Sequence, residues 1–307
     1  MHRKLRNLTL CLCLSITASV FAEEALVLQT DFGLKDGAVS AMKGVAFGVD
    51  KQLKIYDLTH EIPAYNIWEA SYRLYQTAEY WPQGTVFVSV VDPGVGTDRK
   101  SVVLKTKTGQ YFVSPDNGTL TLVAQKFGIE SVRQIDEKVN RLKGSEKSYT
   151  FHGRDVYAYT GARLAAGVID YAQVGPLLES KVVMIPYQAP ELKNGELNGN
   201  IPILDIQYGN VWSNIDSGLF TQLNVKAGDT LCIKIKHGQT LKYSSKAPYV
   251  ASFGDVPDGK PLVYLNSLLN VSIALNTANF SAKYDVHSGP DWSISLKKCV
   301  TARTISQ

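Results

Sequence analysis

The stretch that decides the fold is TVFVSVVDPGVG, residues 85–96. Its first seven residues are rich in β-branched side chains and predict a buried strand, Thr85–Val91. The strand runs straight into Asp92, followed by a loop whose glycines permit a tight turn and a close approach of the backbone to a ligand. In parallel sheets, ligands gather at the carboxyl ends of strands. The stretch therefore predicts both a sheet and the edge of a binding site.

Strands and helices alternate on either side of this stretch. This alternation implies an α/β domain with a mainly parallel sheet and helices on its faces. Asp31, like Asp92, follows the end of a predicted strand. We predict strands at 25–29, 53–58, 101–105 and 111–114, and helices at 37–49, 67–80, 120–126 and 155–166.

The pattern changes in the second half of the chain. Pro186, Pro190 and the turn-forming KNG at 193–195 predict a linker. Short strands separated by Gly and Asp turns follow, which favours a smaller C-terminal all-β, barrel-like domain. We predict these strands at 201–208, 211–215, 230–236, 249–253, 262–265 and 271–275. The expected organisation is a signal peptide at 1–22, an α/β domain at 25–183, a linker at 184–199 and the β domain at 200–302.

The N-terminus has the layout of a secretory signal peptide. Arg3, Lys4 and Arg6 precede an apolar run from Leu8 to Phe21, and VFA at 20–22 is a small-x-Ala cleavage site. An uncleaved anchor is the alternative, although the run is shorter than the ~20 residues that a spanning helix needs. We therefore expect an exported protein, periplasmic or secreted, that does not interact with membranes after cleavage.

Charge and cysteine content narrow the possible partners. The full chain has 32 basic and 28 acidic residues, and loss of residues 1–22 leaves 29 basic residues and a net charge of +1. This balance argues against nucleic acid or an anionic membrane as a partner. Cys232 and Cys299 remain, either as one disulfide or as two buried free thiols. No CxxC motif or His cluster indicates a metal site, and we expect neither a metal nor a separate cofactor.

Three polar segments are candidates for chemistry. Asp31 offers two acceptor oxygens that could hold both hydroxyls of a ribose, although it could instead cap a helix. Asp92 and Arg99 flank the glycine loop and could face each other, or form an exposed ion pair of little energetic weight. His152, in FHGRD at 151–155, could bind or orient water, or could be a structural histidine.

Together, the segments resemble those of the S-adenosylmethionine hydroxide adenosyltransferase family, relatives of the bacterial fluorinase and chlorinase. They occur in family order from about residue 25 to about residue 280, so the resemblance covers the whole chain after the signal peptide. The motifs that carry it are TDFG (30–33), VDPGVGT (91–97) with Arg99, SPDNG (114–118), FHGRD (151–155), LAAG (164–167), Asp205 with YGNVWSNI (208–215), YLNS (264–267) and SIA (272–274).

The resemblance implies an enzyme that hydrolyses S-adenosylmethionine to adenosine and methionine by in-line attack of activated water on the ribose C5′. Asp92, Arg99 and His152 match the triad that water-using members place around the nucleophile. Halogen-using members have Tyr at the position of Asp92 and Ser at that of Gly153. The implied substrate contacts are Asp31 with the ribose hydroxyls, Tyr65 around the sugar, Asp205, Ser267 and Asp36 at the methionine end, Asn210 with adenine, and the backbone of Leu275 and Thr277 along the adenine edge.

Some residues depart from the family pattern. Leu268 stands where the fluorinase has an Arg beside the methionine carboxylate, and Ala38 replaces a nearby Ser, so the methionine end is held differently or takes another adenosyl compound. Two other functions stay open: an exported protein that binds an adenosyl compound without turnover, and halide-dependent cleavage. The resemblance also implies a homotrimer, with each site between the first domain of one subunit and the second domain of its neighbour.

Overall fold

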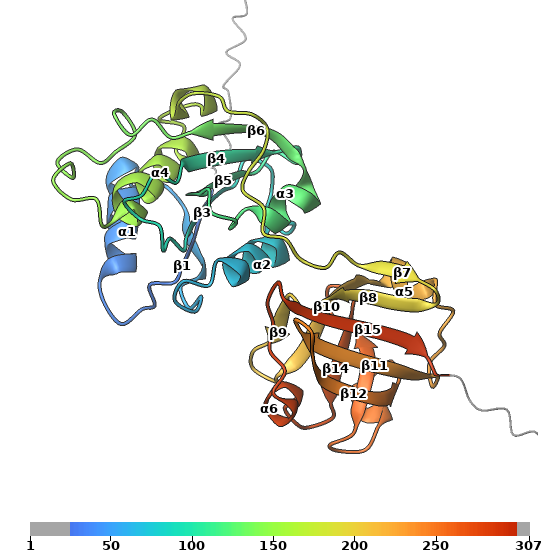
Figure 1. The fold of residues 1–307 in the computed structure, drawn as a ribbon. Helices are drawn as coiled ribbons and strands as arrows, with labels where there is room; N and C mark the ends of the chain where they lie inside the picture. Colours follow the sequence, from blue (N-terminus) through green and yellow to red (C-terminus); the bar gives the residue numbers. More distant parts are fainter. Residues whose placement is uncertain (1–24, 300–307) are drawn as a thin grey trace, which may run out of the picture.

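The chain is described by a computed structural model over residues 25–299. It forms an α/β domain and a β domain, joined by an extended segment (Figure 1). The predicted signal peptide at 1–22 lies outside the described residues, as do residues 300–302 of the predicted second domain. Within residues 25–299, no helix is long and apolar enough to cross a membrane.

A six-stranded sheet forms the centre of the first domain. Its strands are β1 (Leu26–Thr30), β2 (Ile55–Thr59), β3 (Val86–Val90), β4 (Ser101–Thr106), β5 (Tyr111–Pro115) and β6 (Ile129–Gln134), in the order β2-β1-β3-β5-β4-β6. The first four strands in this order are parallel, whereas β4 is antiparallel to β5 and β6. Every residue of β1 and β3 is buried, as expected for parallel strands covered on both faces. The predicted, mainly parallel sheet is confirmed.

Helices cover both faces of this sheet (Figure 1). They are α1 (Ala38–Val49), α2 (Ile67–Ala78), α3 (Thr121–Phe127) and α4 (Tyr159–Ala165), which a π-helical segment, η1 (Gly153–Ala158), precedes. Alternate residues of a strand point to opposite faces. Leu28 of β1 accordingly lies in one core with Met42 of α1 and Ala162 of α4, whereas Val27 lies in another with Leu74 of α2.

The second domain consists of two antiparallel sheets that share one hydrophobic core. The four-stranded sheet has the order β13-β14-β10-β9, and the five-stranded sheet has the order β12-β11-β15-β8-β7. The strands are β7 (Glu191–Lys193), β8 (Glu196–Asn200), β9 (Ile203–Asp205), β10 (Asn210–Asp216), β11 (Thr230–His237), β12 (Thr240–Pro248), β13 (Pro261–Leu265), β14 (Asn270–Leu275) and β15 (Trp292–Lys298). Two short helices, α5 (Ser217–Thr221) and α6 (Phe280–Tyr284), interrupt the strands.

The predicted linker at 184–199 contains β7 and most of β8. These strands form a hairpin in which Lys193 is paired with Glu196. The two residues between them, Asn194 and Gly195, both have positive φ, 52° and 73°. Asn-Gly is the preferred sequence for such a two-residue hairpin turn. The turn residues that predicted a linker therefore join two strands.

The structure corrects the prediction for the second domain in three further ways. The segment 249–253 is not a strand, because Tyr249 makes only an isolated bridge to Val263. β12 and β15 were not predicted, although both pair with β11 along its length. The expectation of strands alone is also corrected by α5 and α6.

The two remaining cysteines form a disulfide. Cys232 lies in β11, and Cys299 directly follows β15, the antiparallel neighbour of β11. Of the two alternatives left by the sequence, the structure therefore has the disulfide. The bridge spans a sequence separation of 67 residues, and closing a loop of that length stabilises the fold by about 4 kcal/mol in the chain-entropy account.

Candidate active site

The carboxyl edge of the parallel sheet carries the first group of candidate residues. β1 and β3 are parallel neighbours with Thr30 opposite Val90, so the residues that follow them emerge at the same edge. Asp31 and Asp92 line one cavity of about 250 Å³, together with His152. The remaining lining residues are Phe32, Ala64, Tyr65, Val90, Val95, Thr150, Phe151 and Gly153. We call this space the first cavity.

Asp92 and Arg99 form a buried, bidentate ion pair. Arg99 Nε lies 2.8 Å and 3.1 Å from the two Asp92 carboxylate oxygens, and Arg99 Nη2 also donates to Asp92. The side chains are only 6% (Asp92) and 10% (Arg99) exposed. The alternative of an exposed surface pair is therefore wrong. The start of the loop is fixed by Asn117, whose side-chain amide donates to the carbonyl of Val91 at 2.9 Å.

The Arg99 guanidinium is also hydrogen-bonded on the side that faces away from Asp92. Nη1 donates to Ser101 Oγ at 3.0 Å, and this hydroxyl is hydrogen-bonded to Tyr157 Oη at 3.0 Å. Burial works against the charge of Arg99, but hydrogen bonding to Asp92 and the nearby Tyr157, Asp92 and Glu137 outweigh it and raise the pKa of the guanidinium. Arg99 is therefore a fixed cation that orients the Asp92 carboxylate.

His152 completes the cluster. Its Nδ1 lies 3.0 Å from Arg99 Nη2, and the residue is 6% exposed. Burial lowers the pKa of His152, Arg99 and Arg141 lower it further, and Glu137 and Asp92 oppose them. The net shift is downward, so the imidazole is uncharged at neutral pH. The structure thus brings the three predicted catalytic side chains together.

Arg141 also contacts this cluster and was not singled out by the sequence. Its Nη2 lies 3.1 Å from His152 Nε2 and pairs with Glu137, and the side chain of Arg141 is 6% exposed. The guanidinium carbon lies 4.7 Å from the centre of the Tyr149 ring. Arg141 precedes His152 by eleven residues in an irregular segment, so no motif or periodicity indicated the contact.

Asp31 faces the first cavity and does not cap a helix. Its Oδ2 accepts a hydrogen bond from the backbone N–H of Tyr65 at 2.9 Å. The residue at the N-cap of α1 is Gly37, which makes no side-chain cap bond. Tyr65 is 72% exposed and has φ +67°, a conformation uncommon for a residue with a side chain. Asp36 does not line this cavity, and instead accepts from the Ala38 N–H at 2.9 Å.

The predicted residues of the second domain line another cavity, of about 700 Å³, which we call the second cavity. Asp205 and Asn210 are paired across β9 and β10, and the Asn210 amide donates to the Asp205 carboxylate at 3.2 Å. Ser267, Leu275 and Thr277 also line this cavity. Its aromatic side chains had no predicted role, and they are Tyr208, Trp212, Phe253 and Tyr264. Among residues 25–299, no group of three His, Cys, Asp or Glu side chains could hold a metal ion.

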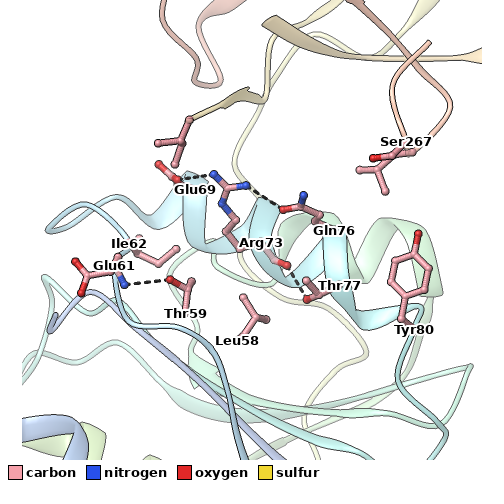
Figure 2. Close-up of a pocket in the computed structure, with 12 residues that line it drawn as sticks. Leu58, Thr59, Glu61, Ile62, Glu69, Arg73, Gln76, Thr77, Tyr80 and Ser267 are labelled. Carbon is pink, nitrogen blue, oxygen red and sulfur yellow. Dashed lines mark hydrogen bonds and ion pairs between the residues drawn. The ribbon is translucent and has the colours of Figure 1, made fainter. Parts of the chain in front are cut away.

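A separate cleft lies between the two domains within one chain (Figure 2). Figure 2 shows Ser267 across this cleft from α2, where Arg73 bonds to Glu69 and Gln76. Ser267 therefore borders the second cavity and this cleft, whose volume is about 480 Å³. No residue lines both the first and the second cavity. Within one chain, the two groups of predicted site residues do not meet.

Comparison with known proteins identifies the family. Residues 26–175 match the SAM hydroxide adenosyltransferase N-terminal domain, and residues 199–293 match the SAM hydroxide adenosyltransferase C-terminal domain. The two matches cover most of the sequence and include both cavities. The chain therefore belongs to the SAM hydroxide adenosyltransferase family.

Individual relatives agree with this assignment. An (R)-S-adenosyl-L-methionine hydrolase of Methanocaldococcus jannaschii is 38% identical over 234 residues, which are 75% of this chain and 80% of the relative. A fluorinase of Actinopolyspora mzabensis is 26% identical over 294 residues, covering 88% of this chain and 96% of the relative. A crystal structure of an uncharacterized conserved protein from Thermotoga maritima matches with a TM-score of 0.80 and 36% identity, over 89% of this chain and 100% of that chain.

Proposed function

We propose that this protein hydrolyses S-adenosylmethionine to adenosine and L-methionine. The observation that carries the proposal is the buried cluster of Asp92, Arg99 and His152 beside the first cavity, which Asp31 also lines. Membership of the family and the names of the hydrolase relatives support the same reaction.

The chemical step is a substitution at the ribose C5′. The substrate carries a sulfonium, so methionine leaves as a neutral thioether and needs no acid. Water attacks C5′ from the side opposite sulfur: the O–C5′ bond forms, the C5′–S bond breaks, and its electron pair stays on sulfur. One water proton stays on the new 5′-hydroxyl of adenosine and the other must be removed. Holding the water in line with C5′ lowers the barrier by up to ~7–11 kcal/mol.

The departing proton goes to Asp92 in this proposal. Arginine is not a proton acceptor at neutral pH, so the choice within the cluster lies between Asp92 and His152. Arg99 binds the Asp92 carboxylate through paired hydrogen bonds, which fix its orientation. Asp92 Oδ2 accepts two hydrogen bonds from Arg99, whereas Oδ1 accepts only one, so Oδ1 can still accept from water.

Substrate contacts divide between the two cavities. In the first, Asp31 holds the ribose hydroxyls and Tyr65 packs around the sugar. In the second, Asn210 and the Leu275–Thr277 backbone bind adenine, while Asp205 and Ser267 hold the methionine group. The reaction as proposed uses only groups of the protein, the substrate and water, and it needs no metal or separate cofactor.

We propose further that the protein acts as a homotrimer. The first and second cavities share no residue within one chain, and Asp205 and Ser267 border a different space from Asp92. A cyclic assembly in which the first cavity of one subunit faces the second cavity of its neighbour would complete each site. The exposed side chains of Tyr65 and Tyr208, one on each cavity, suit such an interface.

We also propose export as the location. The support is the signal-peptide layout of residues 1–22 and the Cys232–Cys299 disulfide, since disulfides persist in oxidising compartments.

The test is product analysis in isotopically labelled water. Purified protein is incubated with S-adenosylmethionine in H₂¹⁸O, using the R and S sulfonium forms separately. The proposal predicts adenosine with ¹⁸O at the 5′ position, and loss of the activity in Asp92→Asn. Tight binding without product would instead indicate a binding protein. A 5′-halo-5′-deoxyadenosine whose formation depends on chloride or fluoride would indicate halide transfer.

A further inference from the structure

Both ring nitrogens of His152 face a guanidinium group. Nδ1 lies 3.0 Å from Arg99 Nη2, and Nε2 lies 3.1 Å from Arg141 Nη2. Arginine donates from every nitrogen and accepts at none, whereas an uncharged imidazole accepts at one nitrogen and a protonated imidazole at neither. Proton uptake by His152 would therefore remove its accepting nitrogen and place a third positive charge between two others.

Arg141 is held firmly in this position. Glu137 pairs with it, and the Tyr149 ring packs 4.7 Å from its guanidinium carbon. The neighbours of Arg141 in the chain are also anchored: Asn140 Nδ2 donates to a backbone carbonyl at 2.9 Å, and Leu142 N donates to another at 2.8 Å. A second carboxylate–guanidinium pair thus stands on the opposite side of His152 from Asp92–Arg99.

The two candidate proton acceptors differ in their surroundings. A proton on His152 would lie between Arg99 and Arg141, about 3 Å from each guanidinium. A proton on Asp92 would neutralise the carboxylate and create no new positive charge, with Arg99 as the cation in contact with it. Repulsion between like charges therefore opposes His152, and not Asp92, as the acceptor.

We propose that Arg141 is a positioning residue whose cation, acting against Glu137, opposes protonation of the His152 ring and whose guanidinium fixes that ring, so that the attacking water loses its proton to Asp92. The last step rests on the proposed function, whereas the effect of Arg141 on the ring does not depend on any reaction. The charged groups that face His152 are Arg99, Arg141, Glu137 and Asp92.

The direct test is a titration of the His152 ring by long-range ¹H–¹⁵N NMR, with the signal assigned by its absence in His152→Gln. Arg141→Met removes a cation and should raise the pKa of His152 by about one pH unit. Glu137→Gln removes an anion and should lower that pKa. Arg141→Lys keeps the charge, so the pKa should stay low. If Arg141 and Glu137 only supported the fold, Arg141→Met and Glu137→Gln would not shift the pKa of His152 in opposite directions.

The acid limb of the kcat profile gives a second readout. If catalysis needs an uncharged His152, this limb should move to higher pH in Arg141→Met and to lower pH in Glu137→Gln. KM should stay within about threefold, because Arg141 does not line either cavity.

Arg163→Met is the matched control. Arg163 anchors the same segment, donating to Val139 O at 2.8 Å and Asn140 Oδ1 at 2.7 Å, without contacting His152. It should leave the His152 titration unchanged. An unmoved titration in Arg141→Met, or shifts in the same direction in Arg141→Met and Glu137→Gln, would overturn the proposal. If the unsubstituted protein releases no adenosine, the proposed function fails. The NMR titration still tests whether Arg141 opposes protonation of His152, because it does not depend on any reaction.

Discussion

The first and second cavities are built from different kinds of side chain. The first contains the Asp31 and Asp92 carboxylates and the His152 imidazole, with Arg99 directly behind Asp92. The second has Asp205 as its one charged lining residue, among aromatic and amide side chains. Aromatic faces and amides suit a flat, uncharged base, whereas the dense charges of the first cavity suit the activation of water. The difference fits the proposal that the first domain performs the chemistry and holds the ribose, while the second recognises the base and the methionine group.

The largest effect should come from Asp92→Asn. Asparagine keeps the shape of the side chain but removes the proton acceptor, so kcat should fall by about 10²- to 10⁴-fold. KM should change little, since the proton is removed only in the reaction itself. The measurement is adenosine release over a range of substrate concentrations. A variant that keeps the original kcat would contradict the assignment of chemistry to the first cavity.

Asp31→Asn should have the next largest effect. Replacing a carboxylate that holds two ribose hydroxyls weakens charge-assisted hydrogen bonds, which lowers kcat/KM by roughly 10- to 100-fold. Steady-state kinetics with S-adenosylmethionine measures this loss. Asp50→Asn is the control: Asp50, at the C-terminal end of α1, lines neither cavity and has no predicted substrate contact, so its kinetics should match those of the unsubstituted protein. Equal losses in the two variants would contradict the placement of the ribose.

Trp212→Ala should affect substrate binding but not the chemical step. Loss of an aromatic face from the second cavity should raise KM by roughly tenfold and leave kcat within about twofold. Trp212→Phe restores a ring at this position and should recover most of the loss. A fall in kcat with unchanged KM would show that the second cavity takes part in chemistry, which would remove the distinction between the two domains.

The smallest effect on activity should come from removing the disulfide. Replacing Cys232 and Cys299 together by Ser should lower the stability of the second domain by about 2–4 kcal/mol. The rate of adenosine release at 25 °C should not change, because the bridge lies outside both cavities. Denaturant unfolding and kinetics on the same sample measure both quantities. Unchanged unfolding would show that pairing of β11 with β15 suffices without the bridge.

The same contrast explains what the sequence could predict. Most of the first domain was predictable because its parallel strands are short apolar runs, and because the ends of two of them directly precede Asp31 and Asp92. The antiparallel strand β6, IESVRQ, is mostly polar and was not predicted. Local signals were ambiguous in the second domain. Asn194-Gly195 joins two strands although it resembles a linker, and β12 is a solvent-facing strand with few apolar residues.

Contacts between segments that are far apart in the sequence could not be predicted from local sequence patterns. Arg141 reaches His152 only because the segment after β6 folds back onto η1, where Leu142 N bonds to Asp155 O. The aromatic side chains of the second cavity come from separate strands and loops, so no spacing in the sequence groups them. The family motifs supplied the names of the cluster residues, and the folded chain supplied their burial and hydrogen bonds.

Subunit complementation tests the central claim most directly: the two cavities, from different subunits, form one active site. Asp92→Asn impairs only the first cavity, and a double variant of Asp205→Ala and Asn210→Ala impairs only the second. The two variants are unfolded, mixed in equal amounts and allowed to reassemble. Random pairing then joins an intact first cavity to an intact second cavity at one site in four, so the mixture should recover about a quarter of the original activity at low substrate concentration. Activity no greater than the sum of the separate variants would contradict the shared site.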